Sequence, residues 1–136
     1  MQSVSSLKNQ IYNKLVEVLN EYDPKIKVLQ YQGKIDKQGV VIKELLNTLN
    51  SKDSTNTQNL RNVSYDIKIY TTNSKTMHSI EKAEEIQDYI ISVMENYFRL
   101  KGGFQGMMAN ANTDNATITT LRYSGTWYVE RNCVYN

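Results

Sequence analysis

The amino-acid sequence predicts an α+β domain, in which an N-terminal helix and a long central helix pack on one face of a small, mostly antiparallel sheet of about four strands. Three observations lead to this prediction. Residues 63–72 alternate between apolar and polar side chains, as in a strand that has one buried face. Segments 5–22 and 75–98 each repeat apolar residues at helical spacing. Finally, a chain of 136 residues fits a single domain, here spanning 1–136.

The first predicted element is the helix over residues 5–22. Its apolar side chains share one face and are Leu7, Ile11, Leu15, Val18, Leu19 and Tyr22. A serine among residues 3–6 is expected to cap the first turn, because its hydroxyl accepts from free backbone amides. Pro24 is expected to end the helix, since the residue before a proline avoids helical geometry. A strand over 25–32 and a glycine-containing loop over 33–39 follow.

The middle of the chain, residues 34–60, is predicted to be a variable insertion of helix and loop. Val41, Leu45 and Leu49 share a helical stripe, which indicates a short helix. Residues 51–59 contain no apolar side chain and are expected to form a solvated loop. This loop is either a tolerated surface insertion or an arm that becomes ordered against a neighbouring subunit.

The strand over residues 63–72 is predicted to have one buried and one wet face. The buried face carries Val63, Tyr65, Ile67, Ile69 and Thr71, and the wet face carries Ser64, Asp66, Lys68 and Tyr70. We expect this strand to lie at an edge of the sheet. An uncovered edge strand invites pairing with another chain.

The long helix over residues 75–98 is expected to bury one stripe of side chains. These are Ile80, Ala83, Ile86, Ile90, Val93, Met94 and Tyr97. Its polar flank holds four acids, Glu81, Glu84, Glu85 and Asp88, which are expected to be solvated rather than paired for acid–base catalysis. Gly102 or Gly103 is expected to supply the left-handed residue that ends the helix.

Two final strands are predicted over residues 103–109, which include Met107 and Met108, and over 117–132. On the second strand the core face carries Leu121, Tyr123, Gly125, Trp127 and Val129, and the other face carries Thr120, Arg122, Thr126 and Tyr128. Arg122 and Tyr128 are candidate interface residues, because arginine and tyrosine often anchor contacts between proteins.

Reactive side chains are few, and their spacing does not match a catalytic motif. Cys133 is the only cysteine, which excludes an intramolecular disulfide and a multi-cysteine zinc site. It could act as a nucleophile only with a base, and His78, the only histidine, is the sole candidate. His78, Glu81 and Glu85 could reach one ion, but a metal site needs three or four converging ligands. We therefore expect no enzymatic activity, no cofactor and no metal.

Composition and charge indicate which partners to expect. The net charge is only +2, and no cluster of Lys and Arg marks a dedicated nucleic-acid binder. Ten tyrosines favour a binding protein, since tyrosine is common at contact surfaces. The N-terminal residues lack the apolar run of a signal peptide, and no segment is long enough to span a bilayer. We expect synthesis in a reducing cytoplasm and no membrane partner.

The stretch from NVSYDIKIYTT through the long helix to LRYSGTWYVERNCVYN resembles the tail terminator (tail-completion, gpU-like) proteins of long-tailed bacteriophages. The shared pattern is an alternating strand ending in Ile-Tyr, a polar turn, a long helix rich in Lys and Glu, a Gly-Phe strand, an Asn-rich loop and an Arg-Tyr strand. In this chain its parts are residues 65–70, 75–98, 103–104, 110–115, 122–123 and Tyr135. The helix over 5–22 also fits, whereas 34–59 departs from the short strand and variable loop of the family.

The resemblance implies a structural virion protein without enzymatic activity. Family members form a six-fold ring that caps the finished tail tube, ends its polymerisation and provides the surface for joining the head. The implied partners are copies of the chain itself, the tail tube protein and a neck or head-completion protein, while genomic DNA passes through without sequence-specific binding. The resemblance also implies assembly in the cytoplasm of a bacterial host and a final position in the virion, on the phage tail at the head–tail junction. The candidate interface residues are Asp53, Asn56, Gln58, Glu81, Glu84, Glu85, Asp88, Arg122 and Tyr128.

Three alternatives stay open. A different neck component, such as a head-completion or stopper protein, can share this small α+β build. A nucleic-acid-binding sheet could stack bases on Tyr65, Tyr70 or Tyr128, although backbone binding needs clustered cations. A hydrolase or transferase with an unfamiliar set of catalytic residues is the third.

Overall fold

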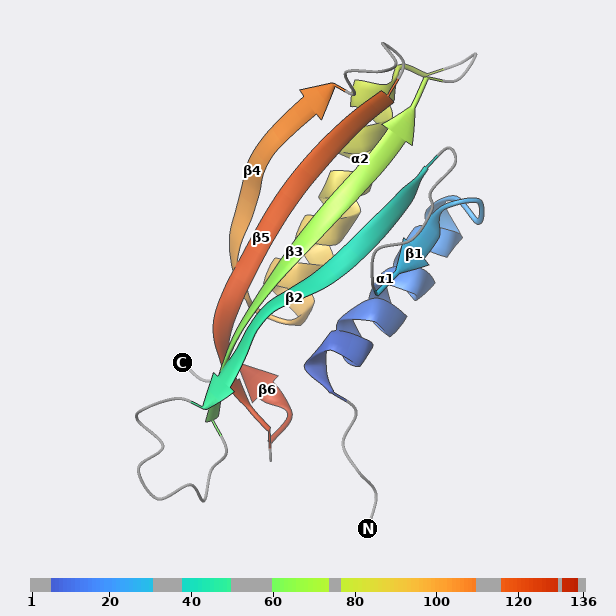
Figure 1. The fold of residues 1–136 in the computed structure, drawn as a ribbon. Coiled ribbons are helices and arrows are strands. Elements are labelled where there is room, and N and C mark those ends of the chain that lie inside the picture. Colours follow the sequence, from blue (N-terminus) through green and yellow to red (C-terminus); the bar gives the residue numbers. More distant parts are fainter. Residues whose placement is uncertain are drawn as a thin grey trace.

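In a computed structural model the chain forms an α+β fold around a curled, mixed sheet (Figure 1). The structure describes residues 6–30, 38–49, 60–73, 77–109, 116–129 and 131–134. Along these residues the elements are α1 (Leu7–Tyr22), β1 (Lys27–Leu29), β2 (Gly39–Leu49), β3 (Leu60–Thr72), α2 (Ser79–Ile91), η1 (Ser92–Tyr97), β4 (Lys101–Ala109), β5 (Ala116–Tyr128) and β6 (Cys133–Val134). The π-helical turn η1 continues α2 without a break.

The sheet of the described residues has six strands, so the prediction of about four strands is only roughly met. The strand order is β1-β2-β3-β5-β4, and the short β6 pairs with the end of β5. The pairing of β1 with β2 is parallel, and the other pairings are antiparallel. The sheet is larger than predicted because β2, which was predicted as a helix, and the short β6 add two strands to it.

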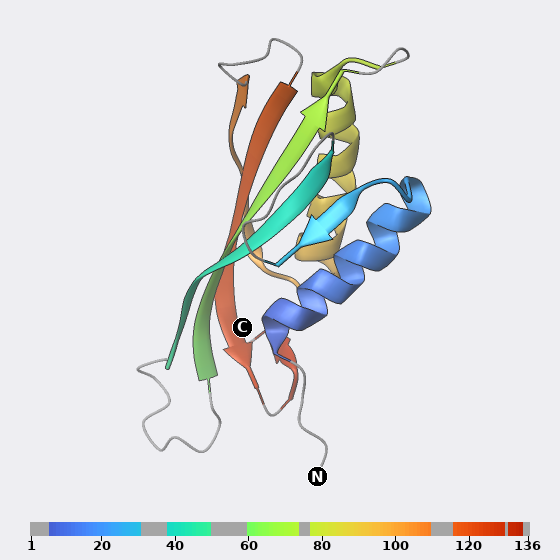
Figure 2. The same cartoon turned by 45° about the vertical axis from the view of Figure 1, so that its right-hand side comes forward.

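Both helices lie on the same face of the sheet, as the sequence predicts (Figure 2). α1 packs on β1 and β2, and α2 packs on β3 and β5. The side chains between these layers are buried and include Ile11, Leu15, Leu19, Tyr65, Ile67, Ile69, Ile86, Ile90, Met94, Leu121 and Tyr123. Each such side chain contributes roughly 1.5–3 kcal/mol on burial, so this layer supplies most of the stabilisation. The opposite face of the sheet carries no helix among the described residues.

The N-terminal helix forms as its sequence predicts. Ser6 caps α1, since its hydroxyl oxygen accepts a hydrogen bond from the Asn9 amide at 3.2 Å. Every fourth residue from Leu7 to Leu19 is buried against the sheet. The helix ends at Tyr22, and Asp23, which precedes Pro24, is extended. The strand predicted over 25–32 is shorter in the structure, where β1 covers Lys27–Leu29.

The short helix predicted around Val41, Leu45 and Leu49 is wrong, because these residues lie in β2. Val40 and Ile42 are fully buried in cross-strand pairs with β-branched residues of β3. Such pairs stabilise a strand, and the weak helical stripe has no apolar surface to pack on. The predicted loop over 51–59 lies outside the described residues.

The prediction that 63–72 is an edge strand is also wrong. β3 lies between β2 and β5 and pairs with both along nearly its whole length (Figure 1). The backbone of this segment therefore has no free side at which another chain could add. Its alternation is as predicted, with Tyr65, Ile67 and Ile69 fully buried on the inner face.

The central helix is shorter than predicted and ends differently. It begins at Ser79, and His78 is its N-cap, with Nδ1 accepting from the Ile80 amide at 3.1 Å. Ile80 and Tyr97 are exposed rather than buried. Ser79 takes the inward position at the first turn, where its hydroxyl bonds Thr117 at 2.7 Å. At the other end the wider π turn rotates Tyr97 out of the stripe.

A left-handed residue does end the helical segment, but it is Arg99, with φ 60°, and not a glycine. Gly102 and Gly103 belong to β4 and have φ of 152° and 147°. A Cβ atom on Gly102 would lie 1.9 Å from the carbonyl oxygen of Arg122 on β5. Gly102 is therefore required because β4 and β5 approach closely at this point.

Candidate functional site

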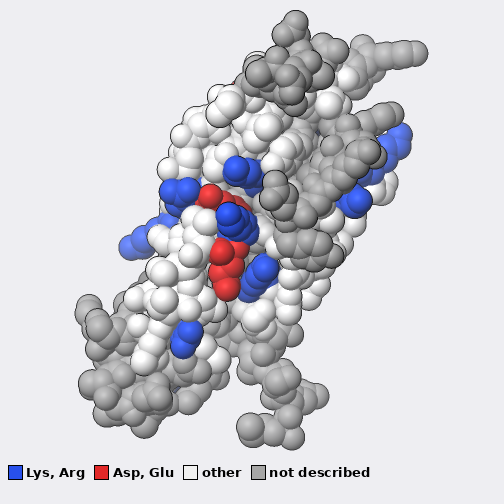
Figure 3. Space-filling model, in the orientation of Figure 1, with Lys and Arg blue, Asp and Glu red and all other residues white. Residues whose placement is uncertain are grey.

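The open face of the sheet carries a row of charges across its three central strands. Lys43 on β2, Asp66 on β3 and Arg122 on β5 are cross-strand partners. Arg122 donates two hydrogen bonds to the Asp66 carboxylate, from Nε at 2.6 Å and from Nη2 at 3.0 Å. Figure 3 shows this face, with acidic side chains at its centre and basic ones around them.

The two candidate residues on β5 are only partly available to a partner. About half of the Arg122 side chain is exposed, and its two hydrogen bonds to Asp66 and the carboxylate charge raise the pKa of its guanidinium. Tyr128 is half-buried, and the Arg131 guanidinium lies 5.3 Å from its ring centre. The candidates Asp53, Asn56 and Gln58 lie outside the described residues.

The first free edge of the sheet is the second half of β2. β1 pairs with residues 39–41 only, so among the described residues no strand pairs with the outer side of β2 from Ile42 to Leu49 (Figure 1). Leu45, Leu46 and Leu49 are 40%, 43% and 48% exposed there. A free edge with exposed apolar side chains is a place where another strand can add.

β4 forms the second free edge, on the opposite side of the sheet. Within the described part of the chain it pairs with β5 alone. Phe104 is 52% exposed and Met108 is 70% exposed, and Lys101 is its only charged residue. The molecule therefore has two apolar edges that are built from different residues.

The four acids of the central helix separate into two groups. Glu81, Glu84 and Asp88 are exposed and form an acidic flank on the outer surface of α2, opposite its buried side chains. Glu85 lies at the border of this flank that faces α1, where its carboxylate accepts a hydrogen bond from the Tyr22 hydroxyl. Because α1 covers β1 and β2 while α2 covers β3 and β5, the opposite border, at Glu84, is the one nearer β4.

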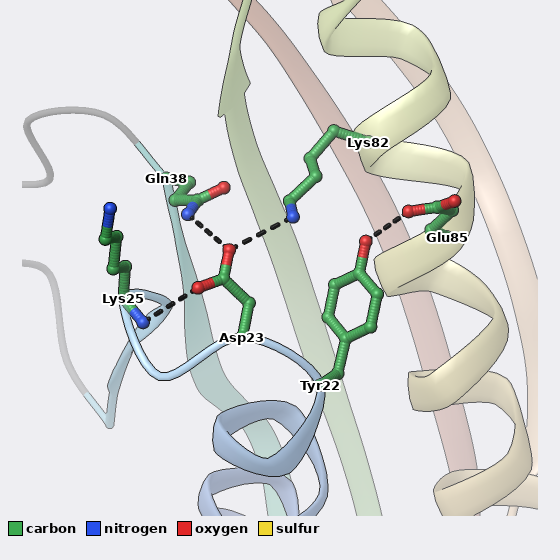
Figure 4. Close-up of polar contacts among 6 residues, drawn as sticks. All are labelled: Tyr22, Asp23, Lys25, Gln38, Lys82 and Glu85. Carbon is green, nitrogen blue, oxygen red and sulfur yellow. Dashed lines mark hydrogen bonds and ion pairs between the residues drawn. The ribbon is translucent and has the colours of Figure 1, made fainter. Parts of the chain in front are cut away.

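A polar network ties the end of α1 to α2 and to the start of β2 (Figure 4). The Asp23 carboxylate accepts from Lys82 Nζ at 3.0 Å, from Gln38 Nε2 at 2.9 Å and from the Lys25 amide at 3.0 Å. Lys82 also lies 4.5 Å from the ring centre of Tyr22. Glu85 is therefore part of an internal contact between the two helices.

The same network shifts the acid–base equilibria of its members. Burial alone would raise the pKa of Asp23, but its hydrogen bonds from Lys25, Lys82 and Gln38 outweigh burial and lower that pKa. For Lys82, burial works to lower the pKa, but the bonds to Asp23 and Tyr22 raise it overall. Both shifts stabilise the charged pair.

A hollow of about 340 Å³ lies beside the point where β1 ends and β2 becomes an edge. Its charged lining consists of Lys8, Lys43, Lys68, Glu44 and Asp66. Both carboxylates already have partners inside the chain. Glu44 accepts from the buried Tyr65 hydroxyl at 3.0 Å, and Asp66 is held by Arg122. The hollow is basic because its three lysines outnumber its two carboxylates, one of which is paired with Arg122.

The structure does not bring the reactive residues together. His78 lies just after the Thr72 end of β3, whereas Cys133 pairs with Tyr128, at the Leu60 end. Because β3 has 13 residues, these ends are about 40 Å apart. No group of His, Cys, Asp and Glu suited to a metal ion occurs within the described residues. Nor, in that part of the chain, is either helix sufficiently long and apolar to cross a bilayer.

The two apolar edges were not recognisable as interfaces from the sequence. Leu45 and Leu49 gave a signal that favoured a helix, and Met108 was one apolar residue in a predicted strand. The signal that could have identified the β2 edge is a strand-like segment with apolar residues on both faces, such as VVIKELL.

Comparison with known proteins gives no further assignment. No protein-family model matches the chain, and no curated protein matches it. The observations that bear on function are therefore the sequence pattern, the two free sheet edges, the acidic flank of α2 and the basic hollow beside β2.

Proposed function

We propose that the protein is a structural subunit of a bacteriophage tail, of the tail terminator type, that assembles into a ring. The observation that carries the proposal is the presence of two different free edges with exposed apolar side chains, on β2 and on β4. A subunit with two unlike contact surfaces assembles head to tail, and such contacts close into a ring when the rotation between subunits allows it.

The resemblance of the sequence to tail terminators supports the same proposal. The finer fold predicted with it is a mostly antiparallel sheet of about four strands, at the positions of β1, β3, β4 and β5. β2 and the short β6 are additional to that predicted sheet. The ring caps the finished tail tube, ends its polymerisation and offers a surface to the neck of the head, while DNA passes through its centre.

The proposed partners use different parts of the subunit. Neighbouring copies meet at the sheet edges, with the acidic flank of α2 close by. Residues 51–59, which are predicted to form a loop and include Asp53, Asn56 and Gln58, are proposed to contact the tail tube or the neighbouring copy. Deleting 51–59 is expected to impair tail capping. If capping is unchanged after the deletion, this role of the loop is excluded.

The test is electron microscopy of particles from the parent phage or prophage that carries a stop codon early in this gene. A terminator predicts overlong tails of variable length without attached heads. Tails of uniform, normal length beside unjoined heads would instead assign the protein to the head side of the neck. Intact, infectious particles would contradict both assignments.

A nucleic-acid-binding sheet is the second candidate, because Lys43, Lys68 and Tyr70 lie on the open face of the sheet. Tyr65 is fully buried and cannot stack a base. Arg122 forms an ion pair with Asp66, which reduces the positive charge available for phosphates. If this candidate is correct, single-stranded DNA binds at low salt and is released as salt rises. No binding at low salt would exclude it.

A further inference from the structure

We propose that neighbouring copies of the chain join by pairing β4 of one copy with the free half of β2 in the next copy. One continuous sheet then runs through the subunits. This inference rests on the proposed ring and specifies its interface. The evidence for it is the direction of the strands, the lengths of the two edges and the charges near them, in addition to the exposed apolar side chains.

Strand directions suit this pairing. Three successive antiparallel pairings lead from β2 through β3 and β5 to β4, so β4 runs opposite to β2 within one copy. Copies related by rotation about an axis roughly along the strands keep their strand directions. β4 of one copy therefore meets β2 of the next in antiparallel orientation, which is the commoner and slightly more stable arrangement. Pairing of like edges would instead require two-fold axes.

The two edges have similar lengths, but within one copy they lie at different positions along the strand direction. The free half of β2 spans residues 42–49, and β4 has 9 residues. Through the registers of β3 and β5, Phe104 lies level with Ile42, and Lys101 lies level with Leu46. Full pairing therefore shifts each copy along the strands by about four residues, or about 13 Å, relative to its neighbour. A repeated shift of this kind tilts the strands of a closed sheet relative to its axis.

This shift also brings opposite charges together. The acidic flank of Glu81, Glu84 and Asp88 lies on the outer surface of α2, with Glu84 at its border nearer β4. In the next copy, Lys8 lies on α1, which is on the same face of the sheet as α2, and it lines the hollow beside the edge of β2. Complementary charges favour one orientation of the contact and oppose the pairing of like edges.

Disulfide cross-linking tests the edge pairing directly. In a Cys133→Ser background, one preparation carries Leu46→Cys, and the others carry Phe104→Cys, Gly106→Cys or Met108→Cys. Mixed at high concentration and oxidised, Leu46→Cys is expected to form linked dimers with the β4 variants, fastest with the one in register. Glu17→Cys, on the exposed side of α1, is the control and is expected to stay at background in every mixture.

Two outcomes would overturn the pairing. Rapid dimers of Leu46→Cys on its own would mean that β2 meets β2, and no cross-link above the control in any mixture would mean that the edges do not meet. The tail-length experiment is independent of this result. Overlong tails without edge cross-links would support the terminator function and exclude the pairing. Uniform tails with edge cross-links would exclude the terminator function and support the pairing.

Charge reversal tests the electrostatic part of the contact. Glu84→Lys combined with Asp88→Lys is expected to weaken self-association about tenfold at low salt, because two attractive contacts become repulsive. Lys8→Glu in the same chain is expected to restore most of the loss. Glu21→Lys, on the exposed side of α1, is the matched control. If the double reversal associates as well as the control, the flank does not face Lys8.

Discussion

Tyr65 and Tyr123 are cross-strand neighbours on the inner face of the sheet, and both rings are fully buried. Their hydroxyl groups differ in hydrogen bonding. Tyr65 donates to Glu44, and burial and this carboxylate raise its pKa strongly. The Tyr123 hydroxyl has no hydrogen-bond partner within the described residues, and burial, together with the charge of Glu95, raises its pKa to about 12. A buried hydroxyl without a partner costs free energy that a bonded one does not.

The two tyrosines should therefore respond oppositely to loss of the hydroxyl. Tyr65→Phe is expected to lower the free energy of unfolding by about 1 kcal/mol, because a hydrogen bond is lost. Tyr123→Phe is expected to leave it unchanged or to raise it by up to about 1 kcal/mol, since an unpaired polar atom is removed from the core. Urea unfolding measures both. A clear destabilisation by Tyr123→Phe would show that its hydroxyl has a partner.

The glycines of β4 provide a second comparison between single residues. Gly106→Ala is expected to change stability by less than about 0.5 kcal/mol, since a Cβ atom there meets nothing within 4 Å. Gly103→Ala has space but also a positive φ, so we expect a loss of about 1–2 kcal/mol. Gly102→Ala combines positive φ with a clash against the Arg122 carbonyl, and a loss above about 3 kcal/mol is expected. Thermal unfolding measures the three variants, and a different order of their stability losses would contradict these roles of the glycines.

At the scale of elements, the polar network at the end of α1 fixes how the two helices meet. Asp23 directly follows α1 and Lys82 lies in α2, and each side chain is 19% exposed. The pKa of Asp23 is lowered from 3.8, so the network adds stability above about pH 4 and loses it as pH falls through the folded-state pKa. The pKa of Lys82 is raised from 10.5, so its part is present below that pH and is lost as pH rises further.

Asp23→Asn is therefore expected to flatten the acid side of the stability profile. The wild type should lose melting temperature more steeply than the variant between pH 4 and pH 2, as the Asp23 carboxylate becomes protonated. Near neutral pH the variant should be the less stable protein. Glu21→Gln, an exposed neighbour on α1, is the control, and parallel profiles for wild type and Asp23→Asn would refute the assignment.

Elements with a strong local pattern were predictable from the sequence, and elements set by tertiary context were not. α1 and the buried face of β3 follow their apolar spacing closely. β2 was missed because its spacing of Val41, Leu45 and Leu49 also fits a helix, and only pairing with β3 decides between the two. Tyr97 was misplaced because a π turn, which spacing does not reveal, changes the direction of the side chains after Ile91.

At the scale of the molecule, the candidate site depends on strand order, which the sequence does not contain. The exposed face of β5 was predicted, but β3 was expected at an edge and lies at the centre. As a result the free edges among the described residues are β4 and half of β2, and neither could be identified before the order was known. Their exposed leucines, Phe104 and Met108 give the molecule two separate apolar borders.

Lysine substitutions on these borders give a prediction about assembly. Leu46→Lys and Met108→Lys each place a charge on one edge, which opposes strand addition there. Each variant alone is expected to stay monomeric, whereas an equal mixture of the two should form a heterodimer, because each partner keeps one intact and complementary edge. Light scattering after gel filtration measures the masses. A mixture that stays monomeric, or that forms large assemblies, would contradict head-to-tail pairing.

The central position of β5 has a consequence for the time at which the chain can fold. The ladder between β3 and β5 joins Thr72 to Ala116 and Leu60 to Tyr128, so the paired residues are 44 to 68 positions apart in the sequence. Contacts this distant in sequence form slowly. Because β4 pairs with β5 alone among the described residues, the second edge has no platform until residues 116–128 have left the ribosome. Until then a nascent chain has the β2 edge and the side of β3 that β5 later covers, so assembly through β4 is restricted to chains whose synthesis has passed β5.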